Sequence, residues 1–146
     1  MKWIPDSLVP ILVGGSTMVS ETETVIYRND NWVVVQDPKH TQDQFHLTAW
    51  YLRDIRSILE VTQAICQQFR ELTQELQQHN LLVEGFQEFV HFPPNFWRLH
   101  VHFVGPNHQA EAPESEVFPV SEVVRYYQQD PNYFTTRVTV PKLSNI

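Results

Sequence analysis

The sequence contains a single cysteine, Cys66, among its 146 residues. One cysteine cannot form an intramolecular disulfide, and it excludes a zinc site built from several cysteines. This cysteine usage suits a reducing compartment. We therefore expect a cytoplasmic location. A nuclear location in addition is compatible with the sequence.

Basic residues are also scarce. Ten Lys and Arg stand against seventeen Asp and Glu, so the formal net charge is −7 and the pI is near 5.4. A general nucleic-acid coat or a membrane-surface binder needs a broad positive surface, and this balance disfavours both. A small anionic ligand remains compatible, because it needs only a few local cations.

Long hydrophobic runs are absent as well. The apolar run near the N-terminus is broken by Pro10 and is too short to span a membrane, and a signal peptide is the weaker alternative. No internal repeat or low-complexity tract occurs. The hydrophobic content of 42% and aromatic content of 12% predict one folded domain, residues 21–146, after an irregular arm, residues 1–20.

The first half of the domain contains three short runs of β-branched and aromatic residues. They predict strands over Val25–Tyr27, Trp32–Gln36 and Phe45–Leu52. The first two are separated by the turn sequence RNDN, which indicates a hairpin.

A long helix is predicted to follow, as far as about His79. Ser57 and Glu60 form a capping-box pattern at its start. Apolar residues then recur at three- and four-residue spacing, which places them on one stripe: Ile58, Val61, Ile65, Phe69, Leu72 and Leu76.

The second half adds two more strands and a short helix. Leu81–Phe92, with a possible bulge at Gly85, is predicted to pair antiparallel with Arg98–Val104 across a Pro–Pro–Asn turn. Ser121–Gln128 is predicted as a helix and Thr135–Val140 as a last extended run. The order β-β-β-α-β-β-α favours an α+β fold, an antiparallel sheet with one long and one short helix on one face.

One predicted strand has a polar face that an ordinary core strand would lack. Arg98, His100 and His102 alternate with Leu99, Val101 and Phe103, so successive polar residues lie about 7 Å apart on one side. Such a face is costly unless a ligand occupies it. We interpret the ligand as a phosphate, with His91 of the pairing strand nearby.

Several chemistries fit this group of residues. Imidazole can attack phosphorus, shuttle a proton or bind a metal. Arg98 can neutralise a phosphate with two hydrogen bonds, and Asn95 is either a phosphate donor or simply a turn former. A zinc site formed by His91, His100 and His102, or purely structural histidines, are the alternatives from the residues alone.

Two segments before the long helix offer further candidates. Lys39 is a second possible phosphate cation, although it and Asp37 also read as ordinary solvated loop residues. Trp3 is either an apolar anchor for the N-terminal arm or an aromatic platform for a flat ligand.

Beside these local readings stands a family resemblance. The stretch LHVHF, preceded by VHFPPNFW, resembles the signature of the histidine-triad (HIT) superfamily. More narrowly, it is similar to the L-H-Y-x-P-S-Y-Y-H-L-H-V-H-F pattern of scavenger mRNA-decapping enzymes. The segments VVVQDPKH, WYLRDIRSILEVT, EAPESEV and VVRYYQQDPNYF also look like that family's catalytic domain, and the resemblance covers roughly residues 20–135.

The resemblance implies a HIT-like domain that dimerises through its helix and sheet edge and uses no metal or other cofactor. It implies hydrolysis of a nucleotide pyrophosphate, the 7-methylguanosine cap dinucleotide or a short capped RNA. No membrane partner is expected. Dinucleoside polyphosphates or nucleoside phosphoramidates are alternative substrates, and a weakened cap- or nucleotide-binding module is the alternative that is not an enzyme.

The resemblance also assigns roles to residues. His100 matches the nucleophile that forms a covalent nucleotidyl–histidine, and His102 and His91 match phosphate-binding histidines. The remaining matches concern phosphate and base contacts: Asn95 (serine in the family) at the phosphates, Asp37 and Lys39 at the base or ribose, Trp3 stacked on the cap, and Glu21 or Glu23 at the edge of the base.

Three departures from the family pattern stand out. Arg98 replaces the first histidine of the triad, and a guanidinium has no acceptor with which to relay a hydrogen bond. Phe96 replaces a phosphate-facing tyrosine. The separate N-terminal domain of the family is not matched by this sequence. Because the residue matching the nucleophile is present, we expect activity.

Overall fold

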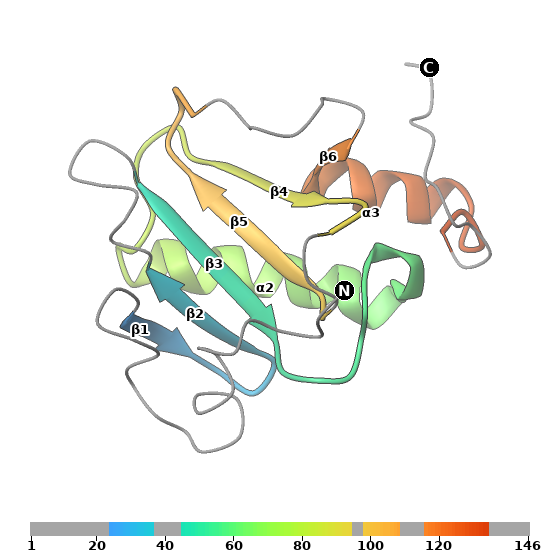
Figure 1. Ribbon diagram of the computed structural model, residues 1–146, viewed down its shortest axis with the longest axis horizontal. Coiled ribbons are helices and arrows are strands. Elements are labelled where there is room, and N and C mark those ends of the chain that lie inside the picture. Colours follow the sequence, from blue (N-terminus) through green and yellow to red (C-terminus); the bar gives the residue numbers. More distant parts are fainter. Residues whose placement is uncertain (1–23, 37–44, 95–97, 109–115, 135–146) are drawn as a thin grey trace.

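The computed structural model describes residues 24–36, 45–94, 98–108 and 116–134. Within these ranges the chain forms a six-stranded sheet in the order β1-β2-β3-β5-β4-β6, with every neighbouring pair antiparallel. Helices α2 and α3 pack into the same apolar core on one side of the sheet (Figure 1). The predicted α+β fold is confirmed.

The three strands predicted in the first half are confirmed, with no end shifted by more than one residue. They are β1 (Thr24–Arg28), β2 (Trp32–Gln36) and β3 (His46–Tyr51). In the hairpin turn, the side-chain oxygen of Asn29 accepts hydrogen bonds from two backbone N–H groups, at 2.8 Å each. This asparagine explains why RNDN closes the hairpin.

The long helix begins later than predicted. A short 3₁₀ turn, η2 (Ile58–Glu60), comes first, and α2 spans Gln63–Gln78. Ser57 caps η2, whereas Thr62 caps α2 with its hydroxyl. The carboxylate of Glu60 accepts from the backbone N–H of the residue before Ser57 and from that residue's side chain, so the predicted reciprocal capping box is wrong.

The predicted apolar stripe is confirmed, because all of its side chains are buried in the hydrophobic core. The second helix, α3 (Val120–Gln129), packs beside α2, close to the predicted range. The stripe residues are at most 3% exposed: Ile58, Val61, Ile65, Phe69, Leu72 and Leu76.

Strand β4 (Gln87–His91) is less than half as long as the strand predicted over Leu81–Phe92. The N–H of Leu81 instead returns to the carbonyl of Leu76 at 2.9 Å, after Asn80 adopts a left-handed φ of 56°. Orphan carbonyls at a helix end are commonly satisfied in this way. The first part of the predicted strand therefore closes helix α2.

Gly85 is a turn residue and not the predicted bulge. Its φ of +74° lies in the left-handed region, and a Cβ placed there would lie 3.2 Å from the Cβ of Pro106. Both conditions favour glycine. A register irregularity does occur elsewhere, within β1, between Val25 and Tyr27.

Strand β5 (His100–Val104) lies inside the sheet, between β3 and β4. The predicted antiparallel pairing with the preceding strand is confirmed. A short strand that the sequence did not predict, β6 (Val117–Pro119), pairs with the outer edge of β4. Thr135–Val140 lies outside the described residues, and no helix among those described is long and apolar enough to cross a membrane.

Candidate functional site

Histidines from three strands meet on the face of the sheet that points away from the helices. Val101 and Phe103 of β5 belong to the core, so the alternate residues His100 and His102 face the other way. The ring centroid of His102 lies 5.2 Å from His100, 5.1 Å from His91 of β4 and 5.2 Å from His46 of β3. The predicted grouping of His91, His100 and His102 is present in the structure.

His100 is held in one tautomer. Its Nδ1 lies 3.0 Å from the carbonyl oxygen of Arg98. A carbonyl can only accept, so Nδ1 carries the hydrogen and Nε2 keeps its lone pair. Burial lowers the pKa of His100 to about 4, an effect that His91 increases and the Arg98 carbonyl opposes. At neutral pH the ring is therefore neutral, with a free electron pair on Nε2.

His102 is fixed by a neighbouring imidazole. Its Nδ1 lies 3.0 Å from Nε2 of His46, and the ring of Phe89 stacks on it with centroids 5.3 Å apart. Burial lowers the pKa of His102 well below its ordinary value, and the surrounding histidines lower it further. His102 is therefore a neutral, oriented ring that remains partly exposed on the sheet face.

Two further neighbours of these rings are His91 and Trp50. Burial lowers the pKa of His91, although the backbone and the charge of Glu116 raise it in part. Trp50 of β3 stacks on His100 with a centroid distance of 4.2 Å and an interplanar angle of 25°. The site thus holds three neutral imidazoles, those of His91, His100 and His102, between aromatic side chains.

Arg98 does not continue the polar face, contrary to the prediction. Arg98 precedes β5 and has a left-handed φ of 33°. Its guanidinium donates to the carbonyls of Tyr51 at 2.7 Å and Leu52 at 2.6 Å. Asp54 lies 3.5 Å away. These contacts tie the end of β3 to the start of β5, next to the carbonyl that orients His100. A phosphate contact by Arg98 stays a prediction.

Six predicted site residues lie outside the described residues, and their roles stay predictions: Trp3, Glu21, Glu23, Asp37, Lys39 and Asn95. The zinc alternative gains no support, because within the described ranges no group of three or more His, Cys, Asp or Glu side chains is arranged to hold a metal ion.

Two site residues on β3 were not identified from the sequence. His46 and Trp50 alternate with core residues, and the register places Trp50 opposite His100. The signal was present, because His46, Thr48 and Trp50 recur at every second position of a predicted strand. The sequence alone did not show that β3 lies beside β5 in the sheet.

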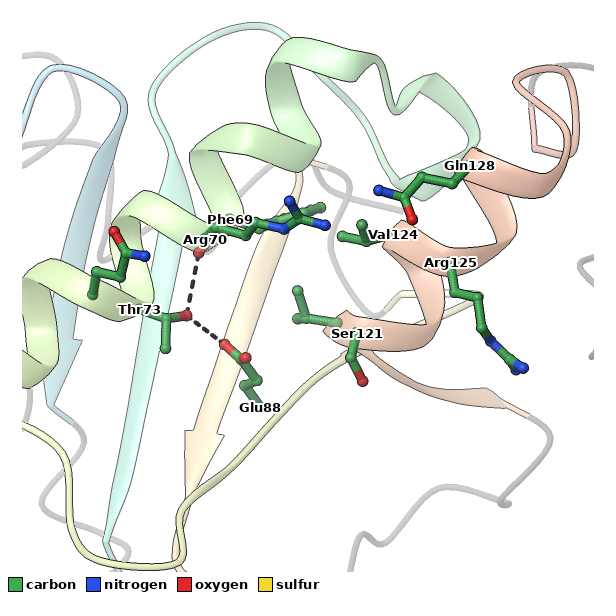
Figure 2. Close-up of a pocket in the computed structure, with 10 residues that line it drawn as sticks. Phe69, Arg70, Thr73, Glu88, Ser121, Val124, Arg125 and Gln128 are labelled. Atoms are coloured by element: carbon green, nitrogen blue, oxygen red, sulfur yellow. Dashed lines mark hydrogen bonds between the residues drawn. The ribbon is translucent and has the colours of Figure 1, made fainter.

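A cavity of about 350 Å³ lies on the opposite side of the sheet, between α2, α3 and β4. Figure 2 shows Glu88 pointing into it beside Thr73. The Thr73 hydroxyl lies 2.6 Å from Oε2 of Glu88 and 3.2 Å from the carbonyl of Phe69. The Thr73 hydroxyl donates to the Glu88 carboxylate. Burial raises the pKa of Glu88, and this hydrogen bond from Thr73 opposes the rise in part.

The raised pKa of Glu88 predicts a pH effect on stability. The folded chain binds this proton more tightly than the unfolded chain, so the stability that the proton provides below the ordinary pKa of 4.5 is lost as pH rises through the raised value. Glu88→Gln is neutral at every pH and keeps an oxygen that can accept from Thr73. We expect its gain in urea-unfolding free energy over wild type to be larger at pH 7.5 than at pH 4.5. Equal differences at both pH values would contradict this, and exposed Glu84→Gln is the control.

Comparison with known proteins connects the histidine face to a family. The model of the family described as "Scavenger mRNA decapping enzyme C-term binding" matches residues 16–117. Among curated relatives, the m7GpppX diphosphatases of Sus scrofa and Homo sapiens are 24% identical over 132 residues and 25% identical over 134 residues. Each match covers 81% of this chain and 39% of the relative, so the chain spans about two fifths of their length.

A solved structure was also found to be similar, a HIT family hydrolase from Clostridium thermocellum Cth-393. It has a TM-score of 0.49 and 13% identity, and the match covers 72% of this chain and 91% of that one. The family match includes strands β1 to β5, and therefore all the clustered histidines of these strands. The resemblance predicted from the sequence is confirmed, and the chain belongs to the scavenger mRNA decapping enzyme C-term binding family.

Proposed function

We propose that this protein hydrolyses the 7-methylguanosine cap dinucleotide, or a short capped RNA, to methylguanosine monophosphate through a covalent bond to His100. The state of His100 carries the proposal: a buried neutral ring with its Nδ1 hydrogen on the Arg98 carbonyl and a lone pair on Nε2. The name of the curated relatives, m7GpppX diphosphatase, supports the choice of substrate.

In the proposed first step, Nε2 attacks the phosphorus next to methylguanosine. The P–O bond to the next phosphate breaks, and its electron pair leaves with the nucleoside diphosphate or the 5′-diphosphate of the RNA. The imidazole then bears phosphorus on Nε2 and hydrogen on Nδ1, so it is positively charged. Water next attacks the same phosphorus, loses its proton to solvent and returns the electron pair to Nε2.

The neighbouring residues support the chemistry by binding phosphate oxygens. The His102 ring lies against both His100 and His91 and is partly exposed, so an N–H of neutral His102 can donate to a phosphate. A phosphate contact by His91 is part of the proposal. We also propose the phosphate and base contacts expected of the six site residues that lie outside the described ranges. The protein is further proposed to form a homodimer through its helix and sheet edge. No metal takes part in any step.

The proposed function is tested by mass spectrometry of the products. The protein and its His100→Asn variant are incubated with m7GpppG, GpppG and diadenosine tetraphosphate. Methylguanosine monophosphate from m7GpppG alone, abolished by the substitution, is the expected result. Hydrolysis of all three substrates would indicate a general pyrophosphate hydrolase. No product from a folded protein would overturn the enzyme and leave a nucleotide-binding module.

His46 is expected to position His102 in this reaction. His46→Phe keeps a ring but removes the hydrogen bond to Nδ1 of His102, and we expect kcat to fall about 10- to 100-fold, since misplacing a catalytic group has effects of that size. His46→Gln retains a donor and should recover part of the loss. Thr48→Val, on the same face of β3, is the control. Steady-state rates of His46→Phe equal to wild type would refute the role.

A further inference from the structure

Trp50 and His100 form a closely stacked pair. They lie directly opposite each other on β3 and β5, and their rings are 4.2 Å apart and 25° from parallel. Trp50 is 5% exposed. One face of the His100 imidazole is therefore covered by indole, and the ring is fixed in plane by the Nδ1 contact to Arg98.

The charge of His100 changes during the proposed reaction. The ring is neutral before attack and positive once phosphorus is bonded to Nε2. Among the residues that the structure describes, the groups found to act on its charge are the Arg98 carbonyl, His91 and His102, and none of them is a carboxylate. An indole face carries negative electrostatic potential and attracts a cation more strongly than a neutral ring. Only an interaction that strengthens as the reaction proceeds accelerates it.

We propose that the Trp50 indole stabilises the positively charged, phosphorus-bearing ring of His100 and is a positioning residue for the nucleophile. The inference rests on the proposed function. Trp50 acts through the His100 ring, by the attraction of its π face for the charge that develops there. It also holds the ring so that Nε2 keeps its direction during attack.

Site-specific fluorination of Trp50 tests the proposal, because fluorine withdraws charge from the indole face while nearly preserving its shape. Mono-, di- and tetrafluorotryptophan are placed at position 50, and single-turnover cleavage of m7GpppG is measured. We expect a stepwise fall in rate, about tenfold in total. Trp50→Phe should retain more activity than Trp50→Leu. A rate unchanged across the series would overturn the proposal.

The same fluorinated series at Trp32 is the matched control. Trp32 is buried on the helix side of the sheet, where its ring contacts Tyr51 and Phe69. Fluorine at that position should leave the single-turnover rate unchanged. A fall equal to that at Trp50 would show a general packing effect and refute a specific role for Trp50.

A second readout separates failure of the inference from failure of the proposed function. If wild type cleaves no substrate, the pairing is tested on protonated His100, which is also a cation. ¹⁵N NMR follows His100, with neighbouring His91 and His102 resolved separately, as pH is lowered. Fluorination of Trp50 should shift protonation of His100 to lower pH. An unchanged midpoint would overturn the stabilisation of charge by Trp50.

Discussion

His100→Asn is expected to lower turnover of m7GpppG by at least about 10⁴-fold, because removal of a covalent nucleophile has effects of that size or larger. Asparagine has no lone pair that can replace Nε2 as a nucleophile. The side chain is shorter but polar, and the neighbouring imidazoles and Trp50 stay in place. The loss should therefore appear in kcat, with affinity for the substrate retained.

Rates from product release and affinity from calorimetry measure this effect. His79→Asn is the matched control, because it removes an exposed histidine at the end of α2 and should stay within threefold of wild type. Far-UV circular dichroism checks that both variants are folded. Turnover by His100→Asn within tenfold of wild type would exclude a covalent intermediate on His100.

Acid should destabilise the fold through the same residue. Above pH 6.5 His100 is neutral in both states, whereas between pH 6.5 and about 4 the unfolded chain binds a proton that folded His100 does not. The free energy of unfolding therefore decreases as pH falls through this window. The shift corresponds to about 3 kcal/mol from His100 alone.

Urea unfolding at pH 7.5, 5.5 and 4.5 measures the loss. His100→Asn has no titrating group at this position, so its stability should decline less than that of wild type over the same range. His79→Asn has the same number of histidines as His100→Asn and is the reference protein. Parallel declines for wild type and His100→Asn would contradict a buried neutral His100. The lowered pKa values of His91 and His102 add to the slope of wild type and variant alike, in the same direction.

Local periodicity was enough to predict most of the fold. Alternation placed His100 and His102 on one face of a strand, and the three- and four-residue spacing of apolar residues identified α2. Apolar composition alone could not distinguish the segment that closes α2 from a strand, so Leu81–Phe86 was assigned wrongly. The three residues of β6 are too few to show a period.

The site was predicted in part, because its key contacts join distant segments. His46 and His102 are separated by 56 residues, and only the order of strands brings them together. Arg98 continues the alternating pattern in sequence, but its backbone turns to a positive φ and its guanidinium finds two carbonyls at the end of β3. A positive φ is signalled in a sequence mainly by glycine, and Arg98 is not a glycine. Hydrogen bonds to carbonyls 46 and 47 residues away have no local sequence signal.

The interior position of β5 has a consequence for how the site fails. Strands three deep on one side and two deep on the other shield it from the frayed margins of the sheet. Amide groups in such a strand exchange with solvent only through the largest opening motions of a domain. We therefore expect the amide groups that flank His100 and His102 to be among the slowest to exchange. Heat inactivation of the site should then coincide with global unfolding of the domain.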